Sequence, residues 1–189
     1  MRSKMLLVLA ALPIASGAQE LNYTFVEGGY INSDIDTGPF NADGDGLGVR
    51  GSFAINEKFH AFGAHATQDL DLDLDTDQLE LGVGRHWRLQ ENVDFIGELS
   101  WVDVDLNSPF GGTDDDGLGL GAGLRGRLNS SLELEGRLNY VDLNDSNTSL
   151  SFSGRYFLWD RFAIGGGLEF DDDDTAWNIG LRAEFGDSD

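Results

Sequence analysis

Hydrophobic residues recur at every second position through most of the chain, which is the period of a β-strand and not of a helix. Leu118, Leu120, Ala122 and Leu124 form one such row. Rows of this kind predict ten strands, each followed by a turn or a loop. The expected strands cover residues 20–32, 47–55, 59–68, 79–89, 93–101, 118–124, 132–140, 150–158, 162–170 and 177–185.

The segments between these rows alternate between two kinds. Short segments such as Asn56-Glu57-Lys58 alternate with longer ones that are rich in Asp and Gly, and we expect the longer ones to be loops. Short turns at one end and longer loops at the other are typical of up-and-down antiparallel barrels of the outer membrane. The expected loops cover residues 33–45, 69–77, 103–116, 142–147 and 171–175.

The polar positions between the apolar ones decide which face is outward. They carry Arg and Glu without Lys or Asp, whereas an ordinary solvent-exposed face uses Lys freely. Arg and Glu alone indicate pairs held away from bulk water, because the planar guanidinium meets a carboxylate through two hydrogen bonds. We therefore predict an all-β transmembrane barrel, apolar toward lipid, with a charged lumen. The predicted lumen charges are Arg50, Glu80, Glu98, Arg125, Arg127, Glu133, Glu135, Arg137, Arg155, Glu169, Arg182 and Glu184.

Three features fit this pattern poorly. Glu27 and Arg85 fall on the expected lipid-facing positions, where a charge is costly near the middle of the membrane. Arg85 is close enough to a turn for its side chain to reach the interface, and a bulge at Gly28-Gly29 would re-aim Glu27. The row over 59–68 does not indicate which of its faces is outward.

The N-terminus carries the pattern of a secretory signal. Two basic residues precede an apolar run, residues 5–14, and small residues end the segment at Ala18. About ten apolar residues are too few for a membrane-spanning helix, which needs about 20. The order of charged, apolar and small residues predicts a signal peptide over 1–18 and a barrel domain over 19–189. We expect the address to be the outer membrane of a Gram-negative cell.

Composition narrows the range of functions. The chain has 34 acidic and 12 basic residues, a net charge of −22, and no Cys. This charge excludes nucleic acid as a partner, and the absence of Cys excludes disulfides and thiolate sites. Of the 24 Asp residues, 20 lie in the five Asp-rich segments, which contain no Lys or Arg. We therefore expect an acidic outer rim.

The sequence offers little support for catalysis or for a tight metal site. Three His residues, none placed beside the acidic rim, do not indicate a Ser-His-Asp set, so we expect no enzymatic activity and no cofactor. Asn41-x-Asp43-x-Asp45-Gly46 resembles the start of a calcium loop, but Ser52 stands where the bidentate Glu belongs. Either weak divalent-cation binding or a merely solvated acidic rim fits, and we favour the solvated rim. The weak metal candidates are Asp43, Asp45, Asp73 and Asp75.

The two ends of the chain carry resemblances. Residues 178–185, NIGLRAEF, resemble the C-terminal signal by which the barrel-assembly machinery recognises its substrates, through Asn178, Gly180, Ala183 and Phe185. The first hairpin, LNYTFVEGGYIN followed by DGLGVRGS, resembles a subgroup of small proteobacterial outer-membrane barrels linked to quorum-signal regulation and to activation of plant immunity. More broadly, the chain is similar to the OmpA/OmpX-like outer-membrane β-barrel domain. The resemblance implies an outer-membrane address and no enzymatic activity.

These expectations support one interpretation of the protein's role and leave two alternatives. We expect a monomer with a structural or surface-interaction role, whose partners are outer-membrane lipid, lipopolysaccharide and the assembly machinery, with divalent cations as a further candidate. A narrow, cation-preferring porin is the first alternative, because a ten-stranded barrel is only slightly wider than one filled by its own side chains. A soluble, secreted, acidic β protein is the second.

Overall fold

The computed structural model describes residues 20–36, 41–71, 74–109, 111–144, 146–171 and 174–186. The expected signal peptide, residues 1–18, lies outside the described residues. No helix among the described residues is long and apolar enough to cross a bilayer. The strands are β1 (Phe25–Asp36), β2 (Asn41–Asn56), β3 (Phe59–Leu70), β4 (Leu74–Gln90), β5 (Val93–Ser108), β6 (Gly111–Asn129), β7 (Leu132–Asp142), β8 (Ser146–Trp159), β9 (Phe162–Phe170) and β10 (Thr175–Glu184).

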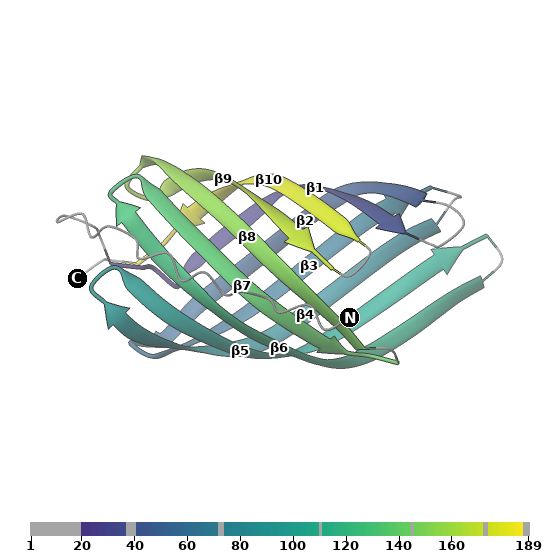
Figure 1. Cartoon of the computed structure of the whole chain (residues 1–189), viewed down its shortest axis with the longest axis horizontal. Helices are drawn as coiled ribbons and strands as arrows, with labels where there is room; N and C mark the ends of the chain where they lie inside the picture. Colours follow the sequence, from purple (N-terminus) through teal and green to yellow (C-terminus); the bar gives the residue numbers. More distant parts are fainter. Residues whose placement is uncertain are drawn as a thin grey trace, which may run out of the picture.

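The strands form a closed antiparallel barrel. Each one pairs with its neighbours in the chain, and β1 pairs with β10 to complete the circle. The strands run obliquely around the barrel axis (Figure 1). The prediction of an all-β, up-and-down barrel is confirmed, with ten strands in the described part of the chain.

One end of the barrel carries tight turns and both described ends of the chain. Asn56 Oδ1 accepts hydrogen bonds from the backbone N–H groups of Lys58 and Phe59 at 2.9 and 3.0 Å, which closes the β2–β3 turn. The Phe185 N–H donates to the Thr24 carbonyl at 2.8 Å, so the start of β1 and the end of β10 lie together. We call this end the turn end, and the opposite one the outer end.

Three of the five expected Asp-rich loops, 33–45, 69–77 and 103–116, were predicted wrongly because strands cover most of each, whereas those at 142–147 and 171–175 do separate β7 from β8 and β9 from β10. β1 continues to Asp36 and β2 resumes at Asn41, while β5 continues to Ser108 and β6 begins at Gly111. Asp and Gly are uncommon in strands, which is why the sequence favoured loops. Backbone pairing nevertheless continues without interruption, and it carries the ends of β5 and β6 outward (Figure 1). The Asp residues therefore stand mostly on strand extensions.

The exterior of the barrel is apolar. On β6, Leu118, Leu120 and Leu124 face outward with 59%, 54% and 38% of their surface exposed. Trp87 and Trp159 are exposed near the turn end, and other aromatic residues are exposed toward the outer end. Soluble monomers rarely expose a continuous apolar surface of this extent, so the exterior disfavours the soluble alternative.

The structure resolves the three features that fitted the pattern poorly. Glu27 faces the lumen, so its expected lipid-facing position was wrong, and β1 pairs with both neighbours in regular register without a bulge there. Arg85 does face outward, exposed on β4. On β3, His60 and Phe62 are buried inside, whereas His65 is exposed outside.

Candidate functional site: the charged lumen

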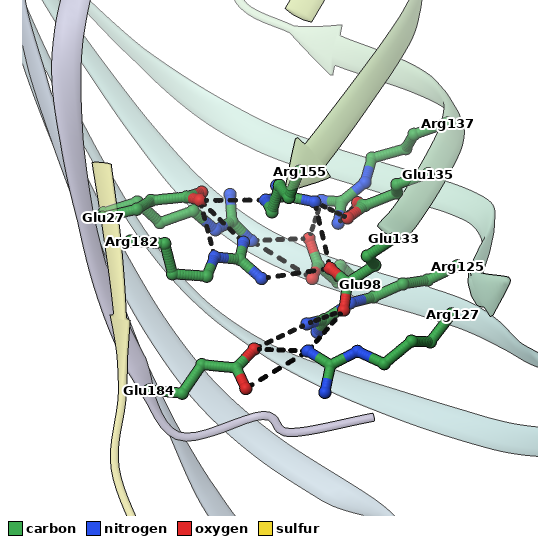
Figure 2. A network of polar contacts seen from close by, with 11 residues as sticks. Glu27, Glu98, Arg125, Arg127, Glu133, Glu135, Arg137, Arg155, Arg182 and Glu184 are labelled. Atoms are coloured by element: carbon green, nitrogen blue, oxygen red, sulfur yellow. Dashed lines mark hydrogen bonds and ion pairs between the residues drawn. The ribbon is translucent and has the colours of Figure 1, made fainter. Parts of the chain in front are cut away.

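The lumen near the turn end is crossed by a continuous network of Arg and Glu side chains (Figure 2). Strand alternation points every second residue inward, so β6 supplies Arg125 and Arg127, and β7 supplies Glu133 and Glu135. These strands lie side by side, and Arg125 pairs across the ladder with Glu135 while Arg127 pairs with Glu133. The alternation of inward and outward residues along each strand, together with the register between strands, therefore brings these charges together.

Glu133 is the centre of this network, and it is fully buried. Its carboxylate accepts two hydrogen bonds from Arg125, at 2.9 and 3.1 Å, and one from Arg127 at 3.3 Å. Arg155 and Arg182 donate to the same carboxylate at 3.3 and 3.4 Å. Four guanidinium groups from three strands thus converge on one buried anion.

Three further carboxylates balance these cations. Glu27 is 2.7 Å from Arg182 and 3.3 Å from Arg155. Glu184 accepts from Arg127 at 3.2 Å, and Glu135 accepts from Arg155 at 3.2 Å. Because Glu27 and Arg182 lie on β1 and β10, this ion pair ties together the two strands that close the barrel.

A second centre lies on Glu98 of β5. Its carboxylate accepts hydrogen bonds from Arg50 at 3.0 and 3.1 Å, and it contacts Arg137 and the His60 ring nitrogen. Arg137 also donates to Glu135 at 2.6 Å, which joins this centre to the first. Cross-linking of strands distant in sequence, such as β2 and β5, gives the barrel support beyond its backbone ladder.

Inward-facing aromatic rings lie beneath several of these guanidinium groups. The guanidinium carbon of Arg182 is 3.7 Å from the ring centre of Phe25, and that of Arg127 is 3.9 Å from Phe157. Arg50 lies 4.2 Å from Phe62 in the same way. Stacking on a ring fixes the orientation of a cation and adds an electrostatic attraction. The sequence analysis did not single out these rings.

The N-terminal segment closes the mouth at the turn end. Tyr23 is buried, and its hydroxyl donates to Asp94 at 2.9 Å. Its ring stacks on His86, with 3.9 Å between ring centres, and lies 5.1 Å from His60. Leu21 packs beside Tyr23 against the inside of β5. These contacts place a buried plug directly beneath the Arg/Glu network.

Beyond the network toward the outer end, the lumen is hollow. A cavity of about 430 Å³ extends from the network to polar residues such as Asn139, Ser149, Ser151 and Asn178. Inward-facing glycines on β9, at 165 and 167, leave room for it. The lumen is therefore filled by side chains near the turn end and contains a cavity toward the outer end.

The structure brings eleven of the twelve predicted lumen charges into ion pairs. Glu80 is the most loosely held, at 3.7 Å from Arg50. Glu169 stands apart: it is exposed near the outer end and accepts a hydrogen bond from Ser149. The network also includes Glu27, which the sequence had placed toward lipid. Asp94, which the sequence analysis had not singled out, is buried and contacts Tyr23 and Arg88.

The other predicted residues lie away from the lumen network. Among the weak metal candidates, Asp43, Asp45 and Asp75 are exposed, whereas Asp73 lies outside the described residues. Within the described part of the chain, no three His, Asp or Glu side chains gather closely enough to hold a metal ion. In the expected assembly signal, Asn178 and Gly180 face the lumen, while Ala183 and Phe185 face outward at the end of the chain.

Comparison with known proteins gives matches among solved structures. No protein-family model matches the chain, and no curated protein matches it. The NanC porin structure matches with a TM-score of 0.50 and 10% identity, covering 86% of this chain and 100% of that one. The KdgM porin matches with a TM-score of 0.50 and 8% identity, covering 86% and 99%. The fold is that of the outer-membrane β-barrels.

A third match has a lower TM-score. Ail, the attachment invasion locus protein of Yersinia pestis, is 15% identical, with a TM-score of 0.47 and coverage of 87% of this chain and 99% of that one. Likenesses at these identities establish the fold alone. The function has to be argued from the residues of this chain.

Proposed function

We propose that this protein is a small, monomeric barrel of the outer membrane whose lumen is a salt-bridged brace and not a diffusion channel. Its role is structural and one of surface interaction: the barrel holds an acidic outer end at the cell surface. The turn end faces the periplasm, and residues 1–18 are removed as a signal peptide during export. The role is non-catalytic.

The apolar exterior supports the membrane address. A strand needs about 9–11 residues to cross a bilayer, and each strand here is long enough, from the nine residues of β9 to the nineteen of β6. A closed barrel also satisfies every backbone hydrogen-bonding group within lipid. The excess length of β4, β5 and β6 projects the outer end beyond the membrane.

Burial of the lumen charges is the observation that carries the proposal. Glu133 is 0% exposed, Arg127 is 1% exposed and Arg125 is 2% exposed, although each bears a full charge. Water does not reach these side chains, and Tyr23 closes the mouth beneath them. A hydrated ion would have to break several buried ion pairs to pass, and each such break is strongly unfavourable.

The acidic outer end supports the surface role. Asp45 pairs across the ladder with Asp69, which pairs with Asp75, and all three are exposed on the outside of the barrel. Lipopolysaccharide phosphates are also anionic, so the two surfaces attract each other only through divalent cations. We propose that calcium or magnesium bridges these carboxylates to the surrounding lipopolysaccharide.

The proposal extends to assembly. The last strand, with Asn178, Gly180 and Ala183, together with Phe185 directly after it, is the segment that we propose the barrel-assembly machinery recognises. Ala183 and Phe185 lie on the lipid-facing side, where a partner in the membrane can reach them.

Conductance in planar bilayers tests the brace directly. Protein whose folded state is verified by heat-modifiable migration on gels should give no steady current. The porin alternative has some support, because Glu80 and Glu169 line the cavity and favour cations. A steady, cation-selective current from folded wild-type protein would establish the porin alternative and refute the brace.

Calorimetry tests the cation bridge. Folded protein titrated with millimolar calcium should bind weakly, and the affinity for purified lipopolysaccharide should fall when a chelator is added. Equal binding to lipopolysaccharide with and without chelator would contradict the bridge while leaving the brace intact.

A further inference from the structure

A hollow indents the lipid-facing wall where strands β4 to β7 lie side by side. Arg85, Gly97, Ala122 and Leu138 are direct neighbours along one row that crosses these four strands. The two middle residues have almost no side chain, so the wall is thin between Arg85 and Leu138. The hollow has a volume of about 460 Å³, and its apolar walls include Val83, Leu99, Leu120, Leu138 and Tyr140.

Arg85 places a cation at the edge of this apolar hollow. Its guanidinium carbon is 4.8 Å from the ring centre of Trp87 and 5.5 Å from that of Phe59. Among the described residues, no carboxylate forms an ion pair with it. A charge on the lipid-facing side of a barrel is unfavourable, although least so near the membrane edge, and the two rings hold this one in a set orientation without neutralising it. The site therefore lacks an anion.

The position of Arg85 indicates where that anion comes from. Arg85 pairs with Phe59, the first residue of β3, which directly follows the turn at Glu57 and Lys58. In the orientation of the proposed function, this end lies in the periplasmic half of the membrane. The lipids of that leaflet are phospholipids, whereas lipopolysaccharide occupies the other leaflet.

We propose that the hollow is a binding site for an anionic phospholipid of the periplasmic leaflet. The phosphate accepts charge-assisted hydrogen bonds from the Arg85 guanidinium, whose planar fork matches phosphate oxygens. One acyl chain lies over Gly97 and Ala122, between Leu99 and Leu138. The inference rests on the proposed membrane address.

The shape of the site favours a lipid over free phosphate. A soluble anion would contact Arg85 but would leave the apolar hollow empty, whereas a phospholipid fills both parts at once. The Trp87 ring lies against Gly97, one of the residues that line the hollow, since a Cβ atom on Gly97 would lie only 3.2 Å from it. Trp87 therefore reports on whatever occupies the hollow.

Fluorescence quenching in lipid vesicles tests the proposal. In a Trp101→Phe, Trp159→Phe, Trp177→Phe variant, Trp87 is the remaining tryptophan. The vesicles are phosphatidylcholine doped with equal amounts of either phosphatidylglycerol or phosphatidylcholine that carries bromine on its acyl chains. The brominated anionic lipid should show a relative affinity about fivefold higher, the scale expected of one cation beside an anionic lipid. Equal quenching by the two lipids would overturn the proposal.

Matched variants separate the two parts of the site. Arg85→Gln should remove the preference for the anionic lipid, whereas Lys58→Gln, the same charge change in the neighbouring turn, should leave it unchanged. Ala122→Leu fills the hollow and should lower the preference with Arg85 still in place. Full preference in Arg85→Gln, or in Ala122→Leu, would overturn the phosphate contact or the chain contact respectively.

Two controls keep this test distinct from that of the proposed function. Millimolar inorganic phosphate should not relieve quenching, and relief would mean that the site binds the anion alone. Heat-modifiable migration is recorded on the same vesicles. A folded, vesicle-inserted barrel without lipid preference refutes the site alone, whereas failure of the wild-type chain to insert as a barrel refutes the membrane address and the site with it.

Discussion

Replacing Glu133 by Gln tests the brace at its centre. The change keeps the size of the side chain but removes the one charge on which Arg125, Arg127, Arg155 and Arg182 converge. It also places an amide N–H₂ group, which donates hydrogen bonds, against guanidinium groups, which can only donate them. Removing one partner from a buried ion pair costs about 3–5 kcal/mol.

The surrounding carboxylates decide where in this range the cost falls. Arg127 retains Glu184 at 3.2 Å, and Arg155 retains Glu135 at 3.2 Å. Arg125 loses both of its short contacts, and its next carboxylate is Glu184 at 3.8 Å. Arg182 also retains Glu27 at 2.7 Å. Since three of the four cations keep a close partner, we expect a loss at the lower end, about 3 kcal/mol.

Equilibrium unfolding in urea, followed by tryptophan fluorescence of the vesicle-inserted barrel, measures this loss. Glu169→Gln is the matched control, because Glu169 is exposed in the same lumen and contacts Ser149 instead of an Arg. Its effect should stay within about 0.5 kcal/mol. Wild-type stability in Glu133→Gln, or equal losses in the two variants, would refute the brace.

Two further substitutions test the wall and the outer end. Gly29→Ala would place its Cβ atom 2.2 Å from a backbone oxygen of β10. We therefore expect the free energy of unfolding to fall by about 1–3 kcal/mol, with less folded protein on heat-modifiability gels. The control is Gly51→Ala, whose Cβ atom meets nothing within 4 Å and which should be neutral or slightly stabilising. Asp105→Asn removes a charge that lies directly opposite both Asp77 and Asp114. It should raise stability in urea by about 0.5 kcal/mol, and more at low ionic strength because salt screens exposed charges; a loss of stability would contradict the proposed repulsion.

The alternation of apolar and polar residues along the strands was enough to predict the barrel and most of its lumen charges. Each inward Arg or Glu of β6 and β7 lies between Leu or Gly neighbours in the sequence, so its face is decided locally. Register then follows from the short turns, and no long-range information is needed to place Arg125 and Glu133 near each other.

The errors arose where a side chain's environment depends on distant strands. Phe25 faces inward because Arg182, at the other end of the chain, stacks on it. With Phe25 inside, Glu27 is inside too, whereas the sequence pattern predicted a lipid-facing position for Glu27. Asp94 is buried because Tyr23 donates to it across the mouth of the barrel. No local pattern encodes either contact.

The ends of the outer strands could not be predicted for a different reason. Asp-rich stretches such as 103–105 and 114–116 have poor strand propensity, yet they stay paired because the register is already set by the membrane-crossing part of β5 and β6. Tertiary pairing overrides propensity here.

The arrangement of an apolar exterior around a charged interior is tested most directly by spin labels on β6. The chain has no Cys, so single cysteines at 118, 120 and 124 and at the alternating positions 119 and 121 can each be labelled without background. In vesicles, collision with oxygen, which concentrates in lipid, should be high at 118, 120 and 124 and low at 119 and 121. The reverse alternation, or equal collision rates with a water-soluble nickel complex at all five positions, would contradict the account.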